Sequence, residues 1–510
     1  MSEPLTLPER AGRAAIWNVL ALGTLAVLTF ATGILIARTL SKAEYAAYGL
    51  FSIALLPGLL AVIDLGLSAS VPKFAAAASR EGGRQGLLRL LALMAGIKLA
   101  LLAVVGTFVL LAGDPVARFL GIPEGVPQGF LAAVIGIACL ELLAEVSQQG
   151  LATLFAQGTV SAIRVVESVS LSGLLIAFIL LGKGVEGILW AFATASFLKL
   201  ILSASGLAVH IRSLPAGLVP QPLTPVLPRL ARHAATFYAA KWSGYLAGPF
   251  AALLLGRSFG GAVVADYSLA TDLSARILEL AIAPVNSLLL PIFAHLLLAP
   301  DRGPVRRAFS VLIKVYAIVL LPAAAGLVVL APLLFRVLYT ERYADAAAYF
   351  QVLYGLVSLD IVFYSVASSA MITAERYGAF LLSRVPILLA AVAAIVLVPV
   401  IGPLATVAVL AGSRVVAVAL LVRSARRLLD ASVPAGFVLR QAAIAAVFAA
   451  ILWAAIRPLP SSPWVLAAAI PVYAVVVLGA LKATGGIGAE DRAALAEMRL
   501  PFKRVLLWLF

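Results

Sequence analysis

The chain of 510 residues contains a single cysteine and only three histidines. Because Cys139 has no second cysteine to pair with, an intrachain disulfide and a multi-cysteine metal site are both excluded. The histidines show no metal-ligand spacing; they are His210, His233 and His295. We therefore predict no metal site and no cofactor.

The chain also lacks the short motifs that carry common catalytic chemistry. The nucleotide-binding pattern G-x-x-x-x-G-K-[ST], the nucleophile motif G-x-S-x-G and the zinc motif H-E-x-x-H are all missing. The polar segments between the apolar runs are too short to form a separate catalytic domain. These absences predict that the protein is not an enzyme.

Charged residues are scarce, at 12% of the chain against 63% hydrophobic residues. A soluble protein of this length has more surface than so few charges can cover. The apolar runs are continuous and rich in Ala, Leu and Val, whereas strands of a membrane β-barrel alternate between apolar and polar residues. The composition predicts an all-α polytopic membrane protein.

At about 20 residues per span, the apolar runs divide into about fourteen transmembrane helices. The first run is too long for a signal peptide and has no cleavage site before Arg38, so we expect an uncleaved span. The expected spans are 14–37, 45–67, 87–112, 129–152, 159–182, 185–207, 235–256, 263–290, 307–331, 346–372, 379–398, 402–422, 438–456 and 464–481.

The formal net charge of +15 raises the question of nucleic-acid binding. Basic loops that face anionic lipid explain this charge better, so we predict membrane lipids and no nucleic acid as partners. With a cytoplasmic N-terminus, alternate segments carry 24 basic residues inside and 8 outside, with 6 left within spans. This bias predicts a bacterial inner-membrane protein with both termini in the cytoplasm.

The longest polar break carries five prolines between His210 and His233. Repeated prolines prevent helix formation, so the break is predicted to be a linker between two six-helix lobes. After the last span, a tail that mixes basic and aromatic residues is expected to lie on the cytoplasmic membrane surface. The expected divisions are a first lobe over 1–208, a cytoplasmic linker over 209–234, a second lobe over 235–424, two further helices over 425–482 and a tail over 483–510.

An internal repeat supports the division into lobes. A shift of 219 residues places RTLSKAEYAAYGL over RSFGGAVVADYSL and VPKFA over LPIFA, with eleven identities across residues 38–75. Because both copies start on the same side in the topology above, the repeat is parallel, with an axis along the membrane normal. Two such lobes that rock about a central cavity have the geometry of alternating access, so the repeat predicts a transporter.

The residues that follow the first expected span resemble a known family. The pattern RTLSKAEYAAYGL followed by DLGLS (Asp64 to Ser68) is similar to the first two helices of polysaccharide-transporter flippases. These flippases belong to the multidrug/oligosaccharidyl-lipid/polysaccharide exporter superfamily. The segment YTERYADAAAYFQVLYG, Tyr339 to Gly355, is similar to the part of that family before the tenth span.

The resemblance implies two six-helix lobes plus two C-terminal helices. It also implies that the substrate is a lipid-linked oligosaccharide (a polyprenyl-pyrophosphate repeat unit) moved to the outer leaflet for surface polysaccharide such as O-antigen. A polysaccharide polymerase and glycosyltransferases are then the candidate protein partners.

Cations within the spans are the candidate substrate ligands, because a charge in the bilayer is costly and marks a functional site. Arg276 is suited to bidentate contact with a phosphate oxygen. Lys98 lies near the middle of its span, and Lys241 has Trp242 and Tyr245 as aromatic neighbours that suit a sugar face. The alternative for each cation is a structural ion pair or an interfacial anchor.

Acidic residues and prolines in the spans are candidates for coupling and gating. Glu141 and Glu145 are one helical turn apart on a polar stripe, and that face must look inward or pair with a basic neighbour. Asp64 is expected to have a structural role at a helix end. Two further acids share a helix face with Arg276, and two prolines are predicted kinks; these residues are Asp272, Glu279, Pro57 and Pro284.

Several other functions remain open at this point. A lipid II flippase also has fourteen spans and a cationic cavity. A cation-coupled multidrug exporter of the same superfamily typically carries an acidic residue in its first helix, and the first apolar run here has none. A multi-span glycosyltransferase or polymerase would need a large loop outside the membrane. A non-transporting scaffold is the last alternative, because fold does not dictate function.

Overall fold

The computed structural model describes residues 25, 27–122, 126–216, 227–298, 301–483, 488 and 491–492. Over these ranges the chain is helical and forms no strand, which confirms the all-α prediction. The helices of the first half are Val27–Thr39, α2 (Lys42–Gly49), η1 (Leu50–Leu55), α3 (Leu56–Asp64), α4 (Leu67–Leu111), α5 (Gly113–Phe119), α6 (Phe130–Thr153), α7 (Gln157–Leu180), α8 (Gly184–Ile211), α9 (Leu227–Leu246), α10 (Phe250–Phe259) and α11 (Gly261–Leu297). Those of the second half are α12 (Gly303–Tyr339), η2 (Glu341–Tyr343), α13 (Ala346–Thr373), α14 (Tyr377–Leu382), α15 (Val385–Ile401), α16 (Pro403–Leu429), α17 (Ala435–Ile456) and α18 (Pro463–Ala483).

Within the described part of the chain, eleven helices are long and apolar enough to cross a membrane. Of the expected spans, the first is described only in part. The seventh, expected as one helix over 235–256, is instead the two helices α9 and α10, separated by a turn at Gly248 and Pro249. Pro249 has no backbone N–H to donate, which explains the break. The eighth expected span lies in α11, which is not one of these eleven helices; its apolar part is the shorter stretch Leu288–Leu297.

The chain divides into two compact units. The first unit is Met1–Tyr245 with Ala252–Ser268, and the second is Leu246–Ala251 with Leu269–Phe510. The lobe, linker and tail boundaries named above remain predictions. Residues 217–226 of the predicted linker and most of the predicted tail lie outside the described residues, and α9 begins at Leu227, within the predicted linker.

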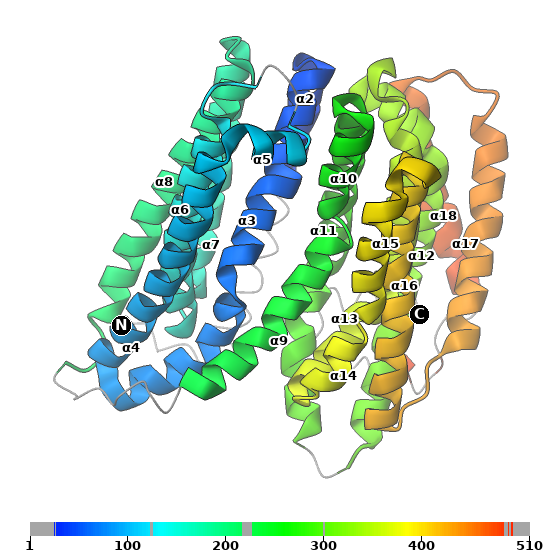
Figure 1. Cartoon of the computed structure of the whole chain (residues 1–510). Helices are drawn as coiled ribbons and strands as arrows, with labels where there is room; N and C mark the ends of the chain where they lie inside the picture. The colour runs from blue at the N-terminus through cyan, green and yellow to red at the C-terminus, as the bar shows by residue number, and fades with distance from the viewer. Residues whose placement is uncertain are drawn as a thin grey trace, which may run out of the picture. The chain divides into compact units, whose positions relative to one another are not determined.

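In the first unit, α6 is the central helix and packs against α4 on one side and α8 on the other, while α7 covers α8 (Figure 1). Its apolar residues supply much of the buried surface, because side chains spaced by three or four positions share a helix face. A cluster around Leu87, Leu91 and Val146 fills the space between α4 and α6. Two acidic residues of α6 face its neighbours: Glu141 contacts Lys199 of α8, and Glu145 contacts Lys98 of α4.

The second expected span shows how a predicted kink is built. Pro57 is near the start of α3, and the residues directly before it form a π-helix, η1. A proline ring clashes with the carbonyl group four residues earlier, and a wider helical turn relieves that clash. Gly58 then receives the ring of Tyr245, because a Cβ at Gly58 would lie 2.6 Å from the Tyr245 hydroxyl oxygen. The irregularity at Pro57 is present, and its role as a hinge stays a prediction.

In the second unit, α12 packs against α13 and α17, and α16 packs against α13 and α15 (Figure 1). The two additional C-terminal helices, α17 and α18, both contact α12. Tyr473 of α18 donates a hydrogen bond to the carbonyl oxygen of Pro322 at 3.0 Å, and its ring lies against Gly326. Glycine is needed here, because a Cβ at position 326 would sit inside the tyrosine ring's contact distance.

Candidate functional site

The most buried charged side chains of the first unit meet at the end of α3. Asp64 is 2% exposed and Lys98, on α4, is 1% exposed. The Lys98 ammonium nitrogen lies 2.7 Å from Oδ1 of Asp64 and 3.0 Å from Oε2 of Glu145 on α6. It also donates a hydrogen bond to the Ser68 hydroxyl at 2.7 Å. Asp64 and Glu145 thus both compensate a lysine that has no water to solvate it.

A second lysine joins this cluster from α9. The ammonium nitrogen of Lys241 lies 3.2 Å from Oδ2 of Asp64, the oxygen that Lys98 does not use. The side chain of Lys241 is 39% exposed, in contrast to the buried Lys98. We call these four residues the Asp64 cluster: Asp64, Lys98, Glu145 and Lys241. Its two cations and two carboxylates cancel, and Lys241 and Glu145, with side chains 39% and 33% exposed, are its partly exposed members.

Local backbone geometry explains why these helices meet. Leu65 (φ 47°) and Gly66 (φ 73°) are in the left-handed region and turn the chain from α3 into α4. A Cβ at Gly66 would lie 2.0 Å from the carbonyl oxygen of Ala234 in α9, so glycine is required for this close approach. Asp64 also accepts a hydrogen bond from the backbone N–H of Ser68 at 3.2 Å, which ties its carboxylate to the turn.

Glu141 belongs to a separate ion-pair group. Its Oε2 lies 2.9 Å from the ammonium nitrogen of Lys199 on α8, and Lys199 makes a second 2.9 Å contact with Oε1 of Glu167 on α7. The hydroxyl of Ser196 donates to Oε1 of Glu141 at 2.6 Å. Glu141 and Glu145 therefore lie on one stripe of α6 and pair with different lysines. Their assignment to coupling stays a prediction.

The aromatic residues beside Lys241 are held by contacts within the first unit. The Tyr245 hydroxyl donates a hydrogen bond to the carbonyl oxygen of Ala54 at 3.1 Å, and the residue is 9% exposed. The Trp242 ring meets the rings of Tyr238 and Tyr245 edge-on. Stacking of Trp242 and Tyr245 on a sugar stays a prediction, because both rings already pack against protein.

The predicted charged triad on α11 is a pair in the structure. The Arg276 Nε donates to Oδ2 of Asp272 at 2.7 Å, with the two side chains 24% and 27% exposed. Glu279 is exposed, and among the described residues it forms no salt bridge, so the three-residue cluster expected from the spacing does not form. The kink predicted at Pro284 concerns a residue whose side chain lies outside the described part of α11.

Three charged residues of the second unit were not among the predicted site residues and are held by close contacts. Arg414 on α16 donates two hydrogen bonds to Oδ2 of Asp360 on α13, from Nε at 3.0 Å and from Nη2 at 2.7 Å. Arg384 is buried between the rings of Tyr364 and Phe380, at 4.4 and 4.9 Å from their centroids. Asp360 and Arg414 lie on different helices, so their spacing in the sequence does not pair them. Only the cost of burying a charge in a span indicates that each needs a partner.

The polar groups of this site offer ion pairs rather than a metal centre. Over the described residues, no group of three histidine, cysteine, aspartate or glutamate side chains is placed to hold a metal ion. The carboxylates of the two clusters face lysines instead. This arrangement allows a lysine to leave its carboxylate partner and bind an anionic ligand instead.

Comparison with solved structures places the fold among membrane transporters. A multidrug-resistance MATE family transporter of the MOP superfamily, in an inward-facing conformation, is 18% identical to this chain. The match covers 82% of this chain and 98% of the transporter, with a TM-score of 0.60. The lipid II flippase MurJ, in an inward closed conformation, is 13% identical and covers 91% and 97%, with a TM-score of 0.68. A MATE transporter from Vibrio cholerae is 16% identical and covers 82% and 96%, with a TM-score of 0.52.

The sequence itself matches one family. A search of curated protein sequences finds no match. The profile of a family described as polysaccharide biosynthesis protein matches residues 34–348, which is more than half of the chain. Together with the transporter-like fold, the eleven long apolar helices of the described residues indicate a multi-pass membrane protein. It belongs to the polysaccharide biosynthesis protein family.

Proposed function

We propose that the protein is a flippase for a lipid-linked oligosaccharide. In this proposal it moves a polyprenyl-pyrophosphate repeat unit from the cytoplasmic to the outer leaflet of the bacterial inner membrane by alternating access. Both termini are in the cytoplasm, and a polymerase and glycosyltransferases are the partners that use and supply the substrate. Support comes from the family match, the transporter fold and the basic bias of alternate segments.

The observation that carries the proposal is the asymmetry of the two lysines around Asp64. Lys98 has three partners and is buried, whereas Lys241 has a single longer contact and is 39% exposed. A diphosphate carries more negative charge than a carboxylate, so it competes with Asp64 for Lys241. When Lys241 leaves, Asp64 keeps Lys98 and Ser68 as partners and does not become an unpaired buried charge.

Arg276, in the second unit, is a further proposed phosphate ligand. Its guanidinium is held by Asp272 and is partly exposed, so it is oriented without being closed off. Planar guanidinium groups bind phosphate oxygens in pairs, which a lysine cannot do. The second unit thus offers an oriented arginine of its own.

A lipid II flippase is the second candidate, because its substrate has the same lipid-linked diphosphate. It is favoured by the 91% coverage of this chain by the solved lipid II flippase, against 82% for the MATE transporters. A multidrug exporter is less favoured. It would need a carboxylate free for a cationic drug, and both Asp64 and Glu141 are occupied by lysines.

A test of the proposal combines deletion of the gene with complementation. We expect the deletion strain to lose surface polysaccharide and to accumulate the lipid-linked repeat unit on the cytoplasmic side. Lys241→Gln should restore little polymer, whereas Lys183→Gln, in the turn before α8, should restore it fully. Unchanged surface polymer together with altered drug sensitivity would rule out the flippase assignment. Arrested cell-wall synthesis with normal polymer would identify the lipid II alternative.

A further inference from the structure

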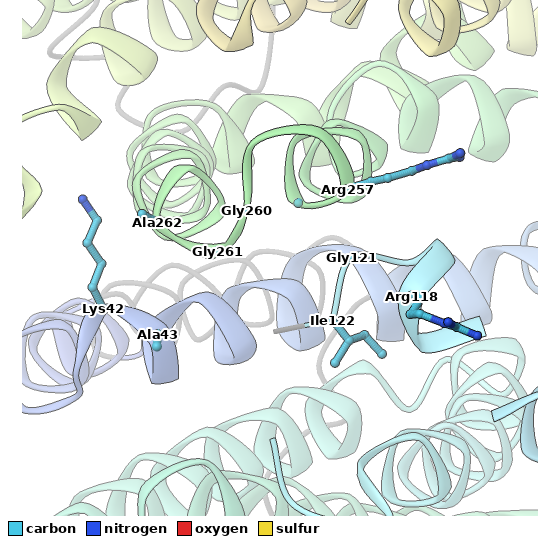
Figure 2. A pocket seen from close by; sticks show the side chains of 10 residues that line it. Lys42, Ala43, Arg118, Gly121, Ile122, Arg257, Gly260, Gly261 and Ala262 are labelled. Atoms are coloured by element: carbon cyan, nitrogen blue, oxygen red, sulfur yellow. The ribbon is translucent and has the colours of Figure 1, made fainter. Parts of the chain in front are cut away.

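A pocket of about 450 Å³ lies at the end of the first unit where α2, α5 and α11 begin or end. This volume is within the ~300–1,000 Å³ of typical small-molecule sites. Figure 2 shows the Gly260–Gly261 turn above the Gly121–Ile122 segment, with Arg118 and Arg257 extending on one side and Lys42 on the other. Three of the ten lining residues are cationic and none is acidic.

The pocket collects basic residues on the side of the membrane where the predicted topology has few of them. In the predicted orientation only 8 of the 38 basic residues lie outside, and Lys42, Arg118 and Arg257 are three of those eight. Basic residues on the outer side oppose the usual bias of membrane proteins, so a cluster of them needs a reason. Binding of an anion gives that reason.

Among the described residues, two of these three cations have no carboxylate partner and are available to bind an anion. Lys42 forms an ion pair with Asp266 at 2.8 Å. Over the described residues, neither Arg118 nor Arg257 forms a salt bridge with a carboxylate, and both are exposed. The guanidinium of Arg257 lies 5.1 Å from the centroid of the Phe119 ring, which orients it without neutralising it.

The backbone of the pocket also favours binding of an anion. α11 begins at Gly261, directly after Gly260, whose φ of 82° is in the left-handed region. The first N–H groups of a helix have no intrahelical acceptor and attract negative charge. Gly121 (φ 67°) approaches the backbone of Arg257 so closely that a Cβ would lie 2.6 Å from its nitrogen. Glycine therefore keeps the two sides of the pocket together.

We propose that this pocket binds the diphosphate group of a ligand on the outer side of the membrane. The choice of diphosphate rests on the proposed function, since the carrier lipid arrives in the outer leaflet with this group. The anion preference itself rests on the pocket alone. A membrane-borne diphosphate and a soluble one share the chemistry, and the experiment below separates them.

The test measures binding of inorganic pyrophosphate to the full chain in phosphatidylcholine nanodiscs. We expect binding that weakens at high salt, and that weakens about tenfold or more in the double variant Arg118→Gln/Arg257→Gln, because two charge-assisted contacts to the anion are lost. Arg457→Gln is the matched control. Its guanidinium also lies 5.1 Å from an aromatic ring, that of Trp453, outside the pocket. It should leave binding unchanged.

Two results would overturn the inference: a folded wild-type protein that does not bind pyrophosphate, or a double variant that binds as well as the wild type. The thermal unfolding midpoint of each variant verifies folding, and Arg118→Lys/Arg257→Lys should recover part of the affinity. Competition by polyprenyl diphosphate in the nanodisc, without competition by phosphatidylglycerol, identifies a membrane-borne ligand. No competition by either lipid identifies a soluble diphosphate. Equal competition by both contradicts the diphosphate assignment.

Binding and export are separate readouts, so the two proposals can fail separately. If the protein binds pyrophosphate through Arg118 and Arg257 but the deletion strain keeps normal surface polymer, the flippase function is contradicted. The proposal that the pocket binds a diphosphate then still stands. Polymer export that survives the double variant, while pyrophosphate binding is lost, shows that the site is not needed for transport.

Discussion

Asp64 and Lys98 form an ion pair in which Oδ1 and the ammonium nitrogen lie 2.7 Å apart, and their side chains are 3% and 1% exposed. The pair joins the end of α3 to the middle of α4, and the second oxygen of Asp64 faces Lys241. Asp64 is thus shared between a buried lysine and an accessible one. The carboxylate of Asp64 therefore has the structural role expected at a helix end, and it also holds Lys241, the lysine that we propose to be exchanged.

Asp64→Asn should strongly destabilise the protein. Breaking a buried ion pair costs up to about 3–5 kcal/mol, and here Lys98 keeps only Glu145 as a carboxylate partner while Lys241 loses its carboxylate partner. The thermal unfolding midpoint of the purified protein checks this. The double variant Asp64→Asn/Lys98→Met should be more stable than Asp64→Asn alone, since it removes the fully buried lysine and leaves only Lys241 and Glu145, which are partly exposed. Additive losses in the double variant would contradict the coupling of these two residues.

Gly58→Ala should destabilise the protein by about 1–3 kcal/mol, the usual cost of overpacking a buried contact. The added methyl group would lie 2.6 Å from the hydroxyl oxygen of Tyr245. Unfolding midpoints for Gly58→Ala, Tyr245→Ala and the double variant form a cycle. The double variant should lose less than the sum of the single variants. Gly96→Ala is the control, because a Cβ there meets no atom within 4 Å.

Hydropathy predicted the helices well because each depends on residues that are neighbours in the chain. An irregularity of the helix near Pro57 was also predictable, because proline cannot donate its backbone hydrogen bond, and a π-helical turn precedes it. The partners of the charges were not predictable. Glu141 and Glu145 have the same surroundings in sequence, yet one contacts Lys199 and the other Lys98, and only the packing of α6 between α8 and α4 decides which.

The spacing argument failed in an instructive way on α11. Positions separated by four and by seven share a face, and this correctly places Asp272 beside Arg276. It does not decide whether a third residue turns toward them, and Glu279 is exposed instead. Similarly, nothing local to Asp64 in DLGLS shows that Lys241, far along the chain, comes within 3.2 Å.

Lys199→Met should be more damaging than Glu167→Gln. Lys199 compensates both Glu141 and Glu167 at 2.9 Å, so its loss leaves two like charges facing each other in a partly buried site. In Glu167→Gln, Lys199 keeps Glu141 as a partner. The amount of folded protein in the membrane and its unfolding midpoint check the order. Equal effects of the two substitutions would show that Lys199 does not hold α6, α7 and α8 together.

The two C-terminal helices can be tested through the contact of Tyr473 with α12. Tyr473→Phe removes the hydrogen bond to the carbonyl oxygen of Pro322 and should cost about 0.5–1.5 kcal/mol. Gly326→Ala should cost more, because the added Cβ would lie 2.4 Å from a carbon of the tyrosine ring and force α18 away from α12. Gly355→Ala on α13 is the control, since a Cβ there meets its nearest neighbour at an ordinary 3.8 Å. Protease sensitivity of the loop before α18 measures the displacement. A Gly326→Ala protein with wild-type stability and protection would contradict the docking of α18 on α12.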